Sequence, residues 1–161
     1  MRARPLALAA AALALAASPA LPADRMPGPF SAVVTKVRDG DTLEATVATW
    51  LDQSVEVAVR IDGIDTPEKA GKCPEERALA AQASEAMRSL VAVPRVLLYD
   101  VRHDKYAGRA LARVVTQDGT DVGKEMVRRG LARPYNGDRK RAWCEIAAAR
   151  APRGIDPRAK E

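Results

Sequence analysis

The sequence predicts a β-rich α+β domain in which five short strands curl into a barrel that carries three α-helices. Apolar and polar residues alternate with a period of two over several short segments. Asp-Gly dipeptides follow two of these segments, as in hairpin turns. A longer segment with helical periodicity lies between the third and fourth strands. Together these observations favour an antiparallel meander that closes on itself.

The strands are justified by their alternation. In the second strand, Leu43, Ala45 and Val47 alternate with polar residues, and the Asp39-Gly40 turn precedes it. In the third strand, Val55, Val57 and Val59 alternate with other residues, so the valines are expected to face the core and Arg60 lies on the opposite face. The five strands are expected at residues 30–37, 42–47, 54–62, 95–101 and 109–116.

The helices are expected at about residues 75–91, 122–129 and 138–149. The first has an apolar stripe and two glutamates in its first turn, near the positive end of the helix dipole. Gly130 follows the second helix, where a left-handed residue commonly ends a helix. The third presents Trp143, Ile146 and Ala147 at helical spacing, which is typical of core residues. A helix between the third and fourth of five strands matches an OB-fold barrel.

The ends of the chain are expected to lie outside this domain. Residues 1–23 combine two arginines, an apolar run and small residues before Ala23, which is the pattern of a secretory signal peptide. After cleavage of this peptide, we expect no stable association of the protein with a membrane. Removal of the peptide would lower the formal charge from +5 to +3, which suits a polyanionic substrate. We therefore expect a signal peptide (1–23), a disordered lead-in (24–29), one domain (30–150) and a charged tail (151–161), in an exported protein that is periplasmic or secreted.

The stretch from Arg60 to Glu68 concentrates the chemistry. After the third strand the chain continues to Asp65-Thr66-Pro67-Glu68, so the carboxylates of Asp65 and Glu68 and the guanidinium of Arg60 fall within nine residues. Carboxylate oxygens suit a hard cation, and a guanidinium suits a phosphate. The alternative is an ordinary helix start, with Asp65 or Thr66 as the cap and Pro67 in the first turn.

Two further segments favour the first interpretation: Val-Arg-Asp-Gly-Asp-Thr-Leu at 37–43 and Asp-Lys-Tyr-Ala-Gly-Arg at 104–109. Together with Asp65–Glu68, they resemble the signature of the staphylococcal (micrococcal) nuclease family, also called thermonucleases, from about residue 32 to residue 132. This resemblance implies an OB-fold. It also implies that Asp41, Asp65 and the backbone carbonyl of Thr66 bind a single Ca²⁺, which leaves Asp39 as a turn residue.

The resemblance also assigns roles in binding and cleaving a phosphodiester. It implies that Arg60 and Arg109 hold the scissile phosphate, and that Glu68 is a general base or, since a glutamate is weakly basic, positions the attacking water. Lys105 and Tyr106 would contact the substrate's terminal phosphate and its sugar or base, and Tyr135 would stack on a base. The chain departs from the family pattern by the insertion of Ala107, which falls in the loop of Lys105 and Tyr106.

Cys73 and Cys144 are the two cysteines of the chain. In an exported protein, two cysteines indicate one disulfide, and the chain has no Cys-x-x-Cys or Cys/His cluster that would indicate zinc. The alternative is a pair of buried, unpaired thiols packed as small apolar residues.

The function that the resemblance implies is Ca²⁺-dependent hydrolysis of phosphodiester bonds in DNA and RNA. It implies cleavage without selectivity for the sugar, a preference for single strands or loosened duplex, and 3′-phosphate ends. We expect the protein to act as a monomer. The alternative is a non-catalytic OB-fold module that binds nucleic acid or oligosaccharide.

Overall fold

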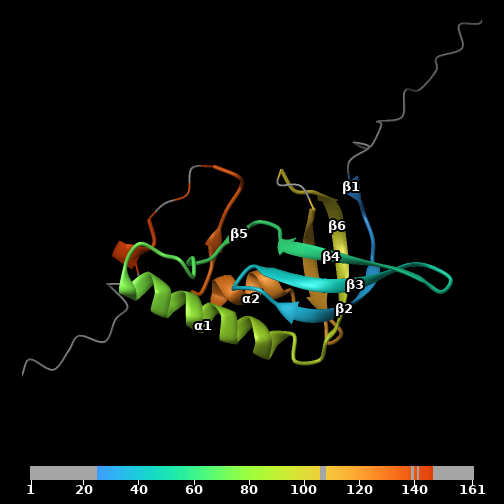
Figure 1. The fold of residues 1–161 in the computed structure, drawn as a ribbon, viewed down its shortest axis with the longest axis horizontal. Helices are drawn as coiled ribbons and strands as arrows, with labels where there is room; N and C mark the ends of the chain where they lie inside the picture. Colours follow the sequence, from blue (N-terminus) through green and yellow to red (C-terminus); the bar gives the residue numbers. More distant parts are fainter. Residues whose placement is uncertain (1–24, 106–107, 139, 141, 147–161) are drawn as a thin grey trace, which may run out of the picture.

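The computed structural model describes residues 25–105, 108–138, 140 and 142–146. Its elements follow the order β1 (Arg25–Met26), β2 (Phe30–Val37), β3 (Thr42–Trp50), β4 (Gln53–Ile61), β5 (Ile64–Asp65), α1 (Pro74–Leu90), β6 (Arg95–His103), β7 (Arg109–Thr116), α2 (Val122–Arg128) and β8 (Arg133–Pro134). Figure 1 shows the strands wrapped around one another, with α1 and α2 on the side away from the long β3–β4 hairpin tip.

Five strands form a closed barrel. The strand order β6-β2-β3-β4-β7 is completed by pairing of β6 with β7. All of these pairings are antiparallel except the one between β4 and β7, which is parallel. The predicted five-stranded OB-fold barrel is thus confirmed, with the long helix between β4 and β6 as expected.

The barrel closes because apolar residues alternate along its strands and fill the interior. Helix α1 adds Ala83 and Met87 to this core, and α2 adds Val122 and Met126, so that both helices cover the barrel. The strands contribute the remaining large buried side chains: Leu43, Val59, Ile61, Val96, Leu98 and Val114.

The alternation predicts burial less well at the far end of the β3–β4 hairpin. Val55 was expected in the core with Val57 and Val59, but it is 52% exposed. Trp50 and Leu51 at the hairpin tip are 74% and 80% exposed. The two strands are longer than the barrel is deep, so their distal residues keep the pairing pattern of a sheet without a core to pack against.

Several boundaries differ from the predictions. Arg25 and Met26 pair with Arg102 and Val101 of β6, although the lead-in was expected to be disordered. The third helix does not begin at Asp138: in the predicted range 138–149, the described residues that are helical are 144–146. Short strands β5 and β8, which pair with each other, were not predicted.

The predicted signal peptide and charged tail lie outside the described residues. No helix in the described part of the chain has the length and apolar character needed to cross a membrane.

Candidate active site

One open cavity of about 410 Å³ collects most of the residues that the sequence singled out. It lies where the ends of β4 and β7 meet the loops that follow β2 and β5. Beside this cavity, Asp65 at the end of β5 and Thr66 directly after it are buried, at 0% and 3% exposure. Tyr106 lies outside the described residues. The predicted residues that line the cavity are Asp41, Arg60, Glu68, Lys105, Arg109 and Tyr135.

The parallel pairing of β4 with β7 places Arg60 near Arg109. In the register of these strands Ala58 is opposite Arg109 and Arg60 is opposite Leu111. The two arginines are therefore offset by two residues on neighbouring strands and share one face, with Cα atoms about 8 Å apart by standard strand spacing. Two guanidinium groups thus reach the same cavity.

A carboxylate holds each arginine in place. Arg60 donates from Nη1 to Oδ1 of Asp41 at 2.7 Å and from Nη2 to the carbonyl of Ile64 at 3.4 Å. Arg109 donates from Nε to Oδ2 of Asp104 at 2.8 Å, and its Nη2 lies 2.6 Å from the same oxygen. These pairs fix the orientation of both side chains before any substrate arrives.

Asp41 is buried, at 4% exposure, and its Oδ1 also accepts a hydrogen bond from Thr42 Oγ1 at 2.9 Å. Burial raises the pKa of Asp41 to about 6; Arg60 opposes this rise and Asp39 adds to it. Asp39 accepts the backbone N–H of Asp41 at 3.0 Å, which is the turn role predicted for it.

Gly40 brings the Asp39–Asp41 turn against the loop that carries Asp65. A Cβ at Gly40 would lie 2.8 Å from Cβ of Ala83 on α1 and 3.1 Å from both Cβ and Oγ1 of Thr66. A larger residue would therefore push the turn away from Thr66. The absence of a side chain at Gly40 lets two acidic loops from distant parts of the sequence pack together.

Asp65 is held by residues from the C-terminal part of the domain. It is the cross-strand partner of Arg133, which donates to Oδ2 from Nε at 3.0 Å and from Nη2 at 2.7 Å. Trp143 Nε1 donates to the same oxygen at 3.0 Å. Burial alone would raise the pKa of Asp65, but hydrogen bonds from Lys140, Trp143 and Arg133 hold it below its usual range.

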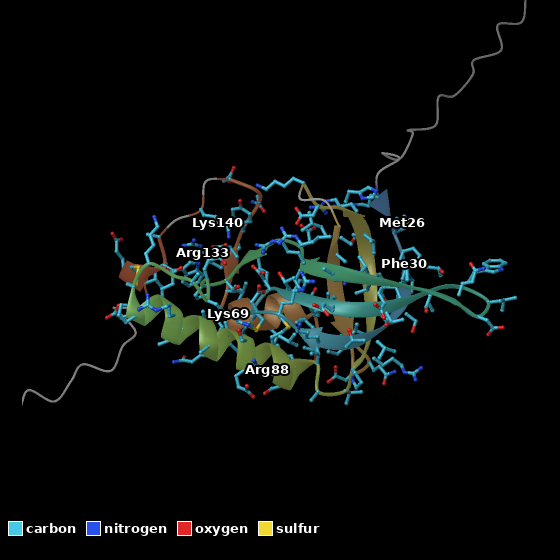
Figure 2. All side chains as sticks on the ribbon, viewed as in Figure 1. Met26, Phe30, Lys69, Arg88, Arg133 and Lys140 are labelled. Carbon is cyan, nitrogen blue, oxygen red and sulfur yellow. A yellow bond between two sulfur atoms is a disulfide. The ribbon has the colours of Figure 1, made fainter. Side chains whose placement is uncertain are left out.

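Lys140 lies between two acids of the site. Its Nζ donates to Oε1 of Glu68 at 2.6 Å and lies 3.1 Å from Oδ1 of Asp65. Burial opposes the charged form, yet these two acids raise the pKa of Lys140, so it remains an ammonium ion. Figure 2 labels Lys140 and Arg133 at the same end of the molecule.

The loop after Glu68 is fixed by Glu76 of α1. Glu76 accepts the backbone N–H of Glu68 at 3.4 Å and that of Lys72 at 3.1 Å. Gly71 makes room for this carboxylate, because a Cβ there would lie 2.6 Å from Cδ of Glu76. Helix α1 begins only after this loop, with Cys73 as its N-cap. The alternative that Asp65 or Thr66 caps a helix is therefore wrong.

Cys73 and Cys144 form a disulfide, with Cα atoms 5.9 Å apart, which confirms the predicted pairing. The alternative of two unpaired thiols is wrong. Glu76 lies close to both sulfur atoms, but their bond leaves no thiolate to bind a metal ion.

The sequence model of the family described as "Staphylococcal nuclease homologue" matches residues 58–151, more than half of the chain. The chain belongs to this family. The match includes Arg60, Asp65, Glu68 and Arg109, whereas Asp41 precedes it.

Two curated relatives are similar to this nuclease-family domain. Both are named "Probable endonuclease LCL3". The protein from Pyricularia oryzae is 36% identical over 83 residues, which cover 50% of this chain and 32% of the relative. The protein from Phaeosphaeria nodorum is 38% identical over 80 residues, which cover 48% and 27%. The match therefore spans about a third of the length of these relatives.

Three residues that contact the acids of this candidate site were not predicted from the sequence. Arg133 and Lys140 gave no signal, because each resembles any surface cation in a basic segment. Trp143 was interpreted as a core residue. It does pack in a small buried cluster with Leu79, but its indole N–H also reaches Asp65. A buried tryptophan usually has a partner for this group, which is the signal that could have identified it.

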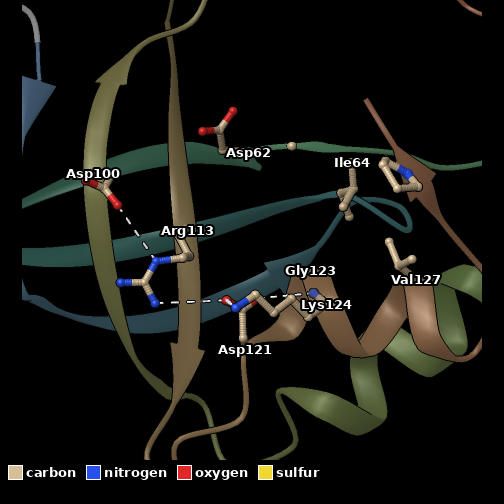
Figure 3. Close-up of a pocket in the computed structure, with 10 residues that line it drawn as sticks. Asp62, Ile64, Asp100, Arg113, Asp121, Gly123, Lys124 and Val127 are labelled. Carbon is tan, nitrogen blue, oxygen red and sulfur yellow. Dashed lines mark hydrogen bonds and ion pairs between the residues drawn. The ribbon is translucent and has the colours of Figure 1, made fainter. Parts of the chain in front are cut away.

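A second cavity, of about 390 Å³, shares only the Asp62–Ile64 turn with the first. Figure 3 shows Arg113 between Asp100 and Asp121. Its guanidinium lies 3.7 Å and 3.9 Å from these two acids, and Lys124 lies 4.0 Å from Asp121. Arg113 and Lys124 of this second cavity are thus both paired with acids.

Proposed function

We propose that this protein is an exported nuclease that requires Ca²⁺ and hydrolyses phosphodiester bonds of DNA and RNA, leaving 3′-phosphate ends. It would act as a monomer on single strands or loosened duplex. Membership of the staphylococcal nuclease family supports the general activity. The observation that carries the proposal is one cavity whose lining includes Arg60, Arg109, Asp41 and Glu68, next to the buried carboxylate of Asp65.

The two arginines would hold the scissile phosphate. A phosphodiester resists attack because its negative charge repels nucleophiles, so cleavage needs donors that follow the charge building on its oxygens. Arg60 and Arg109 line the same cavity from adjacent strands, and each is oriented by a carboxylate. Bidentate contacts from two sides would fix the phosphate in one orientation.

The carboxylates fit a divalent cation. Oδ1 of Asp65 is buried and accepts no hydrogen bond from a neutral donor among the described residues; the Lys140 ammonium lies 3.1 Å from it. The Lys140 ammonium beside it, which also contacts Glu68, shows that this position attracts positive charge. Asp41, Asp65 and the Thr66 carbonyl would hold Ca²⁺, whose flexible coordination suits few carboxylates and several waters. The bound ion would neutralise charge on the reacting phosphate.

Glu68 would orient the attacking water. It lines the cavity on a loop that Glu76 fixes, and its side chain is 60% exposed, so water can reach it. Lys105 and Tyr135 line the same cavity and would contact the substrate's phosphate and a base. A stacking contact would tolerate any base and would favour strands whose bases are not paired.

The decisive test is cleavage of DNA and RNA by the purified protein, with Ca²⁺ or with excess chelator. We expect cleavage of both polymers with Ca²⁺, none with chelator, and products whose 3′ ends become extendable only after phosphatase treatment. Undiminished cleavage in chelator would exclude the metal assignment. Binding without cleavage would instead support a non-catalytic OB-fold module.

A further inference from the structure

We propose that Trp143 is a positioning residue: its indole N–H, with Arg133, fixes Oδ2 of Asp65 so that Oδ1 is the oxygen presented to the divalent cation. The proposal deepens the proposed function and rests on its metal dependence.

The first observation is the unequal treatment of the two oxygens of Asp65. Oδ2 accepts three N–H groups from two side chains, at 2.7 to 3.0 Å. Oδ1 is equally buried and accepts no hydrogen bond from a neutral donor among the described residues; its ion-pair partner is the Lys140 ammonium, 3.1 Å away. A buried carboxylate oxygen without a donor is costly unless a cation binds it.

The second observation is the rigidity of the donors. The guanidinium of Arg133 stacks on the Trp143 ring, 4.5 Å from the ring centroid, so the two donors form one unit. Trp143 is 4% exposed and packs against Leu79 of α1. Its neighbour Cys144 is bonded to Cys73, at the start of the same helix. The indole can therefore neither rotate away nor be replaced by water without disturbing this packing.

The physical consequence concerns rotation of the carboxylate. The carboxylate of an aspartate that is free to rotate exchanges its two oxygens, so binding of a metal ion to one of them costs the entropy of this rotation. Hydrogen-bond donors on Oδ2 of Asp65 restrict this rotation before the ion binds. Trp143 also does so without adding charge, because the indole is a neutral group that can only donate. Partners of this kind, behind the ligand, typically change metal affinity by a factor of 10 to 100 when removed.

The test compares Ca²⁺ binding by calorimetry, without nucleic acid, in the wild type and in Trp143→Phe. Phenylalanine keeps an aromatic ring for the packing but removes the donor. We expect the Kd for Ca²⁺ to rise about 10- to 100-fold. The Ca²⁺ concentration that half-activates cleavage should rise by the same factor, while the rate at saturating Ca²⁺ stays within a few-fold of the wild type.

Two matched controls separate the hydrogen bond from the packing. Leu79→Ala loosens the same cluster but keeps the indole N–H, so it should lower the melting temperature and raise the Kd by much less than Trp143→Phe does. Trp50→Phe removes the exposed tryptophan of the hairpin tip and should change neither. In this Trp50→Phe background the single remaining indole ¹H–¹⁵N resonance belongs to Trp143, and it should shift when Ca²⁺ binds.

A second substitution at position 143 guards against misfolding of Trp143→Phe. Incorporation of benzothienylalanine at position 143 replaces the N–H with sulfur and keeps the shape of the ring, and it should reproduce the higher Kd. The proposal is overturned if both substitutions leave the Kd unchanged, or if Leu79→Ala weakens Ca²⁺ binding as much as Trp143→Phe does. A wild type that cleaves DNA but binds no Ca²⁺ would overturn the metal assignment itself, and this inference with it.

Discussion

Reduction of the Cys73–Cys144 disulfide should lower stability and disturb the candidate site together. The bond links positions 71 residues apart, and the chain entropy that it removes from the unfolded state corresponds to roughly 4 kcal/mol. For a domain of this size, such a loss lowers the melting temperature by roughly 10 to 15 °C. Because Cys144 adjoins Trp143, reduction also loosens the segment that contacts Asp65.

The measurement is thermal unfolding of the wild type and of Cys144→Ser, each with and without reductant. Reductant should lower the melting temperature of the wild type to near that of Cys144→Ser and should leave the variant unchanged. The Ca²⁺ concentration needed for half-maximal cleavage should rise in both reduced wild type and variant. Two free thiols in unfolded, unreduced protein, or identical melting after full reduction, would refute this reasoning.

A second pair of variants separates the crosslink from helix capping. Sγ of Cys73 accepts the backbone N–H of Glu76 at 3.4 Å, so Cys73 also caps α1. In a Cys144→Ser background, Cys73→Ser keeps an acceptor at the cap, whereas Cys73→Ala removes it. The alanine variant should be less stable by about 1 kcal/mol.

The remaining predictions concern the cavity. Arg60→Ala and Arg109→Ala should each lower the cleavage rate by about 10² or more, and Arg109→Lys should not restore it, because one ammonium cannot replace the guanidinium fork; near wild-type turnover of Arg109→Lys would exclude bidentate binding. Glu68→Gln should lower kcat with little change in substrate affinity, and an equal loss of both would indicate a role in assembling the site instead. Asp41→Ala should lose Ca²⁺ affinity, measured by calorimetry, while its circular dichroism stays that of the wild type. In chelator, Asp41→Asn should be more stable than the wild type at pH 8, by up to about 3 kcal/mol, and equally stable at pH 3. Burial raises the pKa of Asp41 from 3.8, its ordinary value in the unfolded chain, to about 6. The contribution of Asp41 to folding stability is therefore present below pH 3.8 and is lost as the pH rises through about 6. Urea unfolding at the two pH values checks this, and equal stability at pH 8 would contradict it.

Local patterns predicted the barrel because the determinants of its strands are local. Alternation and turn dipeptides set each hairpin, and strand β7 has the predicted bounds, Arg109–Thr116. The same alternation wrongly predicted a buried Val55, because a period of two reports pairing but not where the core ends. Whether a strand residue is buried depends on which other elements pack against that part of the strand.

The candidate site was predicted in part, and the missing part has a physical reason. Asp41, Arg60 and Arg109 sit in short motifs that can be recognised in the sequence, and the structure places them on one cavity. The partners of Asp65 lie 68 to 78 positions further along the chain, at Arg133 and Trp143. Their position is set by the pairing of β5 with β8 and by the disulfide, which no local spacing encodes.

The parallel pairing of β4 with β7 has a consequence for the order of folding. The β2–β3–β4 meander is joined by short turns and can form from local contacts, whereas the β4–β7 pair must close a loop that contains α1 and β6. Arg60 and Arg109 meet only in that closing step, since each lies on one of these two strands. A chain with its hairpins formed but its barrel open would hold a phosphate from one side only. During refolding, cleavage activity should therefore lag behind the recovery of strand content.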